Sequence, residues 1–77
     1  MPRAYVKVWV TPGREREVCE SLLGHDAVMT ADVTTGEQDI LCLIEARSYE
    51  ELLQLVAGKL RMTEGITRTV TNLIVEQ

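Results

Sequence analysis

Four stretches of the chain have the residue pattern of β-strands, either alternating or continuously apolar. They are residues 4–10, 27–34, 40–44 and 66–75. In the first, three valines alternate with tyrosine, lysine and tryptophan, which predicts a strand whose valine face is directed to the core. In the second, the alternation predicts that Met29, Ala31 and Val33 share one face, with Val28 on the opposite face.

The other two strands have less regular patterns. Residues 40–44 are apolar at every position, which predicts a central strand with both faces buried. In residues 66–75, Thr69 and Thr71 lie on one face and Val70 lies on the other. Neither face of this last strand is cleanly apolar, so the pattern leaves open which face meets the helices.

A first helix is predicted between Thr11 and Gly24. Thr11 suits the N-cap, and Pro12 suits the first helical position because its missing N–H would have no partner there. Apolar residues then recur at helical spacing, with charged residues on the other side. The apolar stripe consists of Val18, Cys19, Leu22 and Leu23.

A second helix is predicted after residue 48. Ser48 and Glu51 have the spacing of a capping box, with Ser48 as the N-cap and Glu51 reaching back toward it. The apolar residues that follow recur at helical spacing, which predicts an amphipathic helix. Arg61 falls at the C-terminal end, where the helix dipole favours a cation.

The predicted elements follow the order strand, helix, strand, strand, helix, strand. A short turn at Gly36 joins the middle strands into a hairpin, and each helix is a crossover. Right-handed crossovers with both helices on one face give an α+β fold, the ferredoxin-like αβ-plait (βαββαβ), with antiparallel strand order 4-1-3-2. The uncovered face would carry Tyr5, Trp9, Leu41 and Leu43, and we expect these residues to form a homodimer interface.

Length and charge narrow the class of protein. The 77 residues are enough for one domain, predicted to span residues 1–77. The N-terminus lacks the apolar core of a signal peptide, and no apolar run approaches the roughly 20 residues of a membrane span, so we expect a cytoplasmic protein without a membrane partner. Eight basic residues are scattered among twelve acidic ones, and this balance argues against direct binding of nucleic acid.

Few residues offer catalytic or metal-binding chemistry. Cys19 and Cys42 are predicted to be reduced, packed thiols, because no CxxC pair or neighbouring histidine accompanies them. His25 is the only histidine, and its loop supplies no second ligand, which favours a surface position. We therefore expect no metal, no cofactor and no catalytic residue.

The turn between the middle strands combines a glycine with an acidic residue. Gly36 suits a turn that needs a positive φ, and Asp39 can cap that turn. Gly36 would also let a ligand approach the backbone, and Asp39 could accept hydrogen bonds from an ammonium group. The residues by themselves leave both interpretations open.

Two sequence motifs, taken together, point to a family. One is G-x-x-D at residues 36–39, and the other is G-[VI]-x-x-T-x-T at residues 65–71, which precedes an aliphatic end. With the capped helix between them, they make the chain resemble the effector domain of the Lrp/AsnC transcription regulators, the RAM domain with ACT-like architecture. Family members usually carry an N-terminal helix-turn-helix domain, which we do not find here, so the chain is similar to the stand-alone effector-domain proteins of the family.

The resemblance implies a sensor of small molecules, mainly amino acids, that acts in transcription regulation and is not an enzyme. It implies a homodimer formed through the sheets, able to assemble into a ring of four dimers (an octamer), and an interaction with full-length Lrp/AsnC regulators. By matching position it places the ligand near Gly36, Asp39, Thr69 and Thr71, in clefts between dimers. Gln38 departs from the family, which often has an aromatic residue there.

Two other functions are compatible with the predicted fold. A dimeric αβ-barrel enzyme of the small monooxygenase type would share the topology, although the sequence offers it no nucleophile with a base beside it. A structural module would instead use the uncovered sheet face to bind a different protein.

Overall fold

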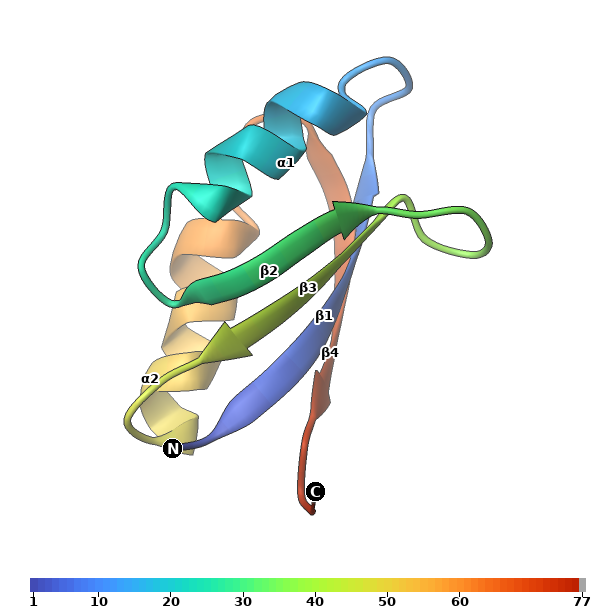
Figure 1. The fold of residues 1–77 in the computed structure, drawn as a ribbon. Helices are drawn as coiled ribbons and strands as arrows, with labels where there is room; N and C mark the ends of the chain where they lie inside the picture. The colour runs from blue at the N-terminus through green and yellow to red at the C-terminus, as the bar shows by residue number, and fades with distance from the viewer. Residues whose placement is uncertain (77) are drawn as a thin grey trace.

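The computed structural model describes residues 1–76 and contains four strands, two α-helices and one π-helical segment. In chain order they are β1 (Arg3–Val10), α1 (Glu15–Leu23), β2 (Val28–Val33), β3 (Ile40–Glu45), α2 (Tyr49–Gln54), η1 (Leu55–Leu60) and β4 (Ile66–Leu73). The π-helix η1 follows α2 directly, so the two make one continuous rod (Figure 1). Gln77, the last residue of the predicted domain, lies outside the described residues.

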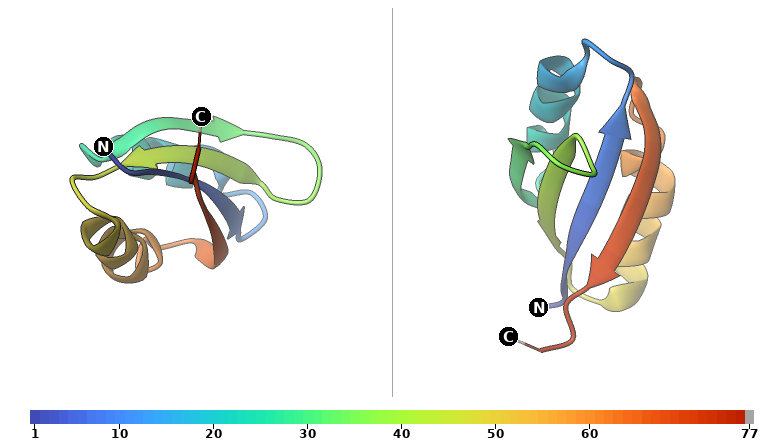
Figure 2. Two further views of the ribbon diagram at one scale, coloured as in Figure 1. Left: turned by 90° about the horizontal axis from the view of Figure 1, so that it is seen from below. Right: turned by 90° about the vertical axis from the view of Figure 1, so that its right-hand side faces the viewer.

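The strands form one antiparallel sheet in the order β2-β3-β1-β4. This is the predicted order 4-1-3-2 read from the other edge, so the ferredoxin-like topology is confirmed. Both helical rods lie on one face of the sheet, and no element within residues 1–76 covers the opposite face (Figures 1 and 2). Strand β3 is central, as predicted: Ile40, Cys42 and Ile44 are buried under the helices, and Leu41 and Leu43 are partly buried on the open face.

A single apolar core fills the space between the sheet and the helices. Its buried members are Ala4, Val6, Val8, Val10, Val18, Leu22, Val28, Ala31, Ile40, Cys42, Ile44, Leu52, Val56 and Leu60. Full burial of one aliphatic side chain stabilises a fold by about 1.5–3 kcal/mol. The period of two along β1 and the helical spacing along the rods therefore specify which faces come together.

Helix α1 begins later than the sequence predicts. Its N-cap is Arg14, so the predictions of Thr11 as N-cap and of Pro12 as the first helical residue are wrong. The cause is Gly13, whose φ of 90° is not helical and turns the chain before the helix can start. The N–H of Thr11 instead donates a hydrogen bond to the carbonyl of Gly65 (2.8 Å), which joins this turn to the start of β4.

The predicted apolar stripe of α1 is wider than the face that the helix buries. Val18 and Leu22 are fully buried, whereas Cys19 is partly buried and Leu23 is 50% exposed. The helix therefore contacts the core along a narrow line of residues.

Strand β2 does not alternate as predicted, because it contains a β-bulge between Val28 and Thr30. The bulge places the extra residue, Met29, between two core positions, so Val28 and Ala31 are both buried while Met29 is 48% exposed. The prediction that Met29 shares the face of Ala31, opposite Val28, is wrong for this reason. Val33 does share the face of Ala31 but lies at the end of an edge strand and is 54% exposed.

The second rod begins as predicted and then changes its hydrogen-bonding pattern. The hydroxyl of Ser48 accepts a hydrogen bond from the N–H of Glu51 (3.1 Å), and the Glu51 carboxylate accepts one from the N–H of Arg47 (3.1 Å). Further along, the N–H of Arg61 donates to the carbonyl of Val56, five residues earlier (3.0 Å). This is the bond of a π-helix, a conformation that is frequent at functional sites.

Candidate functional site

The register of β4 decides the question that the sequence pattern leaves open. Thr69 pairs with Val8 and Thr71 pairs with Val6 across the β1–β4 ladder. Paired residues of antiparallel strands lie on the same face of the sheet, and both valines are buried beneath the helices. The threonine face of β4 therefore faces the α2–η1 rod.

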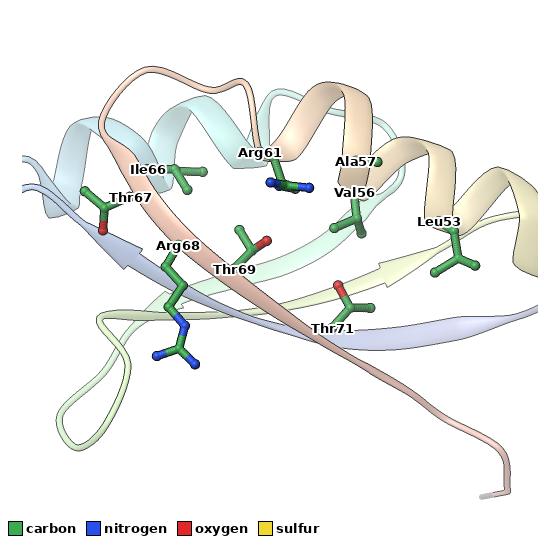
Figure 3. A pocket seen from close by; sticks show the side chains of 9 residues that line it. All are labelled: Leu53, Val56, Ala57, Arg61, Ile66, Thr67, Arg68, Thr69 and Thr71. Atoms are coloured by element: carbon green, nitrogen blue, oxygen red, sulfur yellow. The ribbon is translucent and has the colours of Figure 1, made fainter.

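Between this face of β4 and the α2–η1 rod lies a groove of about 550 Å³. Its lining residues are Leu53, Val56, Ala57, Arg61, Ile66, Thr67, Arg68, Thr69 and Thr71. Figure 3 shows the side chains of Thr69 and Thr71 directed from the strand toward the rod, with Val56 and Leu53 directed back toward the strand. The volume falls within the range of small-molecule sites.

Among the nine lining residues, Arg61 is the one cation whose side chain lies over the interior of the groove (Figure 3). It follows the π-helical turn directly and forms no ion pair with any residue of 1–76. From its sequence position, Arg61 is predicted only as a helix-terminal cation. The signal for its position was present, however, because Leu53, Ala57 and Arg61 recur at intervals of four residues along one side of a helix.

The side chain of Arg68 belongs to the opposite face of the sheet. Arg68 pairs with Trp9 across the ladder, and its guanidinium carbon lies 4.5 Å from the centroid of the Trp9 ring. In Figure 3 it points away from the other lining side chains. The interior of the groove thus combines one guanidinium, the hydroxyls of Thr69 and Thr71, and aliphatic walls.

Asp39 connects the β2–β3 hairpin to the end of β1. Its carboxylate accepts a hydrogen bond from the N–H of Val10 (2.8 Å), and its own N–H donates to the carbonyl of Val8 (3.0 Å). Its carbonyl accepts from the N–H of Thr34 (2.9 Å), which closes the hairpin. Gly36, at the tip, has a φ of 109°, which favours glycine. Gly36 therefore has the turn role that its residue type suggests, whereas the Asp39 carboxylate does not cap the turn and instead binds the backbone of β1.

The hairpin also reaches the uncovered face of the sheet (Figure 2). The indole N–H of Trp9 donates to the carbonyl of Glu37 (2.9 Å), and the Lys7 ammonium lies 3.7 Å from the carboxylate of Glu37. These contacts tie the hairpin to the open face, where Arg68 lies on the Trp9 ring and Tyr5, further along β1, is 44% exposed.

The four predicted ligand residues form two separate groups within one chain. Thr69 and Thr71 line the groove, whereas Gly36 and Asp39 do not. The hairpin adjoins β1 from the β3 side and β4 adjoins it from the other side, so β1 separates the two groups. One chain therefore does not bring all four side chains to one cavity.

The cysteines are packed thiols, as predicted. The Cys19 thiol donates to the carbonyl of Ala31 (3.1 Å), and partial burial raises the pKa of this thiol. Cys42 is fully buried, and this burial raises the pKa of its thiol to about 12. Neither thiol is activated as a nucleophile, because both environments disfavour the thiolate.

Within residues 1–76, no three side chains of the His, Cys, Asp or Glu type gather in a way that could hold a metal ion. No helix in the same range is long and apolar enough to cross a membrane. His25 lies in the turn between α1 and β2, where its carbonyl accepts from the N–H of Val28 (3.0 Å).

The plait topology, with a polar and apolar groove beside its last strand, defines a small α+β ligand-binding domain. The chain belongs to the Lrp/AsnC ligand binding domain family, whose model matches residues 3–77. An uncharacterized HTH-type transcriptional regulator of Pyrococcus furiosus, PF1231, is 34% identical over 71 residues, which cover 92% of this chain and 48% of the relative. The chain thus spans about half the length of that curated relative.

Solved structures with the same fold include one protein of similar length and one of about twice the length. The crystal structure of hypothetical protein PHS023 from Pyrococcus horikoshii is 31% identical, with a TM-score of 0.92 over 100% of this chain and 93% of that one. A transcriptional regulator from Neisseria meningitidis, solved as a complex with L-Met, is 18% identical, with a TM-score of 0.88 over 99% of this chain and 51% of the other. At 18% identity the likeness concerns the fold alone.

Proposed function

We propose that this chain is a homo-oligomeric sensor of an amino acid and acts in transcription control through partner proteins. The observation that carries the proposal is the groove beside β4, where the threonines of the family motif face a π-helical wall. The hydroxyls of Thr69 and Thr71 form no hydrogen bond within residues 1–76 and can therefore bind a ligand. The L-Met complex of the Neisseria regulator supports an amino acid as the ligand class.

The complete site, as we propose it, lies between copies of the chain. One copy supplies the groove with Thr69 and Thr71, and a neighbouring copy supplies the hairpin with Gly36 and Asp39. The second carboxylate oxygen of Asp39 is available to an ammonium group, because only one oxygen binds the N–H of Val10. Binding between copies would link ligand concentration to assembly, since a ligand stabilises the state that it binds.

We propose that the copies meet first through the uncovered sheet face, which carries Tyr5, Trp9, Leu41 and Leu43. A homodimer of this kind could assemble further into a ring of four dimers. Its other partners would be full-length Lrp/AsnC regulators rather than DNA, given the net charge of -4. We propose that this role is cytoplasmic and requires no catalysis. A ligand incubated with the protein should therefore be recovered chemically unchanged, and NMR of the recovered ligand measures this.

The direct test is thermal unfolding with each of the common amino acids at millimolar concentration. A ligand at ten times its Kd stabilises the folded state by about 1.4 kcal/mol. For a domain of this size, that free energy raises Tm by roughly 5–10 °C. A flat response to the whole panel contradicts the proposal.

Asp39 needs two variants, because it also holds the hairpin. Asp39→Asn keeps an oxygen that can accept from the N–H of Val10 but removes the charge that an ammonium group needs. Asp39→Ala removes both. We expect Asn to preserve most of the stability and to weaken amino-acid binding about tenfold or more, whereas Ala lowers stability as well, by roughly 1–3 kcal/mol. Equal binding by wild type and Asp39→Asn would remove Asp39 from the site.

A further inference from the structure

The charges inside the groove are unbalanced. Arg61 supplies a guanidinium, and none of the nine lining residues is acidic. The side chain of Arg68, the other arginine, lies over Trp9 on the opposite face. An ammonium group inside the groove would therefore meet a cation and no carboxylate, while a carboxylate would meet a guanidinium suited to bidentate hydrogen bonding.

The polar and apolar groups occupy different parts of the groove. In Figure 3, Arg61 and Thr69 lie toward the Ile66 end of the groove, whereas Val56 and Leu53 lie further along toward Thr71. A ligand with a carboxylate at one end and a short aliphatic chain at the other fits this arrangement. The volume of about 550 Å³ leaves room for such a molecule and several waters.

The π-helical turn fixes Arg61 in this position. The bond from the N–H of Arg61 to the carbonyl of Val56 spans five residues, so the turn holds one residue more than an α-helical turn would. An α-helical turn over the same residues would rotate Arg61 relative to Leu53 and Ala57, which line the same wall. The irregular turn thus places the guanidinium over the groove.

From these observations we propose that Arg61 is the carboxylate-binding residue of the groove. We further propose that the groove accepts short aliphatic carboxylates whether or not they carry an ammonium group. The 2-oxo acid of an aliphatic amino acid would bind in the groove with its carboxylate on Arg61 and its oxo group near a threonine hydroxyl. Discrimination between amino acid and 2-oxo acid would depend on Asp39 of a neighbouring copy. This inference rests on the proposed sensing function. It adds that Arg61 binds the carboxylate of the ligand and that Asp39 of a neighbouring copy recognises the ammonium group.

The test compares three versions of one ligand by isothermal titration calorimetry on the full chain. From the aliphatic amino acids we would take the one that binds best, its 2-oxo acid, and the amine that lacks the carboxylate. If none of these amino acids binds, leucine and its two analogues serve. We expect the 2-oxo acid to bind within about tenfold of the amino acid and the amine to bind about 10- to 100-fold more weakly, because a lost charge-assisted pair changes Kd by one to two orders of magnitude.

Variants then separate the two proposed roles. Arg61→Gln should weaken both acids at least tenfold, and Arg61→Lys less so, since lysine keeps the charge without the bidentate geometry. Asp39→Asn should weaken the amino acid and leave the 2-oxo acid within about twofold. Arg16→Gln is the matched control, because Arg16 is also an exposed helical arginine but lies on α1, away from the groove. Arg61 is exposed, so its variants should fold, which circular dichroism verifies.

The outcomes distinguish this inference from the sensing function. If the amino acid binds and Arg61→Gln leaves both acids within twofold, or if the amine binds as tightly as the amino acid, the inference is wrong and the sensing function stands. If only the 2-oxo acid binds, and Arg61→Gln weakens it, the inference stands and the amino-acid ligand is wrong. If no carboxylate binds at millimolar concentration, both are wrong.

Discussion

At the scale of single residues, Gly65 is the position least tolerant of a side chain. Its φ is 97°, and a Cβ built on it would lie 2.8 Å from the Cγ2 atom of the buried Val18. Its carbonyl also accepts from the N–H of Thr11, so the backbone cannot move away without breaking that bond. The residue thus fixes how the start of β4 meets α1.

We predict that Gly65→Ala lowers the free energy of unfolding by about 2–5 kcal/mol, the sum of backbone strain and overpacking. Gly58→Ala is the control, because Gly58 lies in η1 and a Cβ there meets nothing within 4 Å. We expect this second change to stabilise by up to about 1 kcal/mol, through helix propensity. Urea unfolding measures both, and similar values for the two variants would contradict the explanation.

Burial of the Cys42 thiol links stability to alkaline pH. Because the folded-state pKa is about 12 and the ordinary value is 9.0, the unfolded chain loses this proton first as the pH rises. The contribution of Cys42 is therefore complete below pH 9 and is lost toward pH 12, by about 1.4 kcal/mol for each pH unit. Cys42→Ala should make the decrease in stability over this range shallower, as measured by urea unfolding at several pH values. Parallel curves for the two proteins would contradict the prediction.

Residue types predicted some of the candidate site but not its geometry. Gly36 has the positive φ that its residue type suggests, whereas the Asp39 carboxylate binds the N–H of Val10 on β1 and does not cap the turn. The sequence could not show that Thr69 and Thr71 face the rod, since the alternation on β4 is apolar on neither side. The spacing of Leu53, Ala57 and Arg61 indicates one side of a helix, but the π-helical turn just before Arg61 is not revealed by a periodicity of 3.6 residues.

At the scale of elements, the regular residue patterns predicted the fold, but the sequence did not predict the local irregularities of the strands and helices. Strand β1 alternates without interruption, and its buried face is the predicted one. The bulge in β2 changes the phase of alternation at Met29, which no local residue signals because Met29 is itself apolar. The positive φ of Gly13 likewise delays the start of α1 despite the helix-start signal of Pro12, because glycine adopts this non-helical conformation readily.

The start of the α2–η1 rod gives a prediction about an element. Ser48 provides the only described side-chain cap of a helix N-terminus, through the N–H of Glu51. We predict that Ser48→Ala destabilises the protein by about 1 kcal/mol, whereas Ser48→Asn, which can also cap, stays within about 0.5 kcal/mol of wild type. Because this rod forms a wall of the groove, Ser48→Ala should also speed amide exchange in residues 49–54, as measured by NMR. Unchanged exchange would show that tertiary packing alone maintains the rod.

At the scale of the whole molecule, the two faces of the sheet are unequal. The helices cover one face (Figure 2), and the other presents the partly buried Leu41 and Leu43 and the Trp9–Arg68 stack. Leu41 and Leu43 lie at the middle of this second face, on the central strand. Packing this face against a second copy would remove the apolar surface from water, and this is the physical reason to expect a dimer.

We predict that the wild-type chain, of 8.6 kDa, elutes as a dimer or a multiple of dimers, and that Leu43→Asp shifts it toward the monomer. A carboxylate at this position would be buried without a partner in the dimer, and such burial costs several kcal/mol. Leu23→Asp is the matched control, because Leu23 is 50% exposed on α1, on the other side of the molecule. Light scattering coupled to size-exclusion chromatography gives the masses. A wild-type monomer would contradict the sheet-face interface, and dissociation by Leu23→Asp instead would move the interface to the helical side.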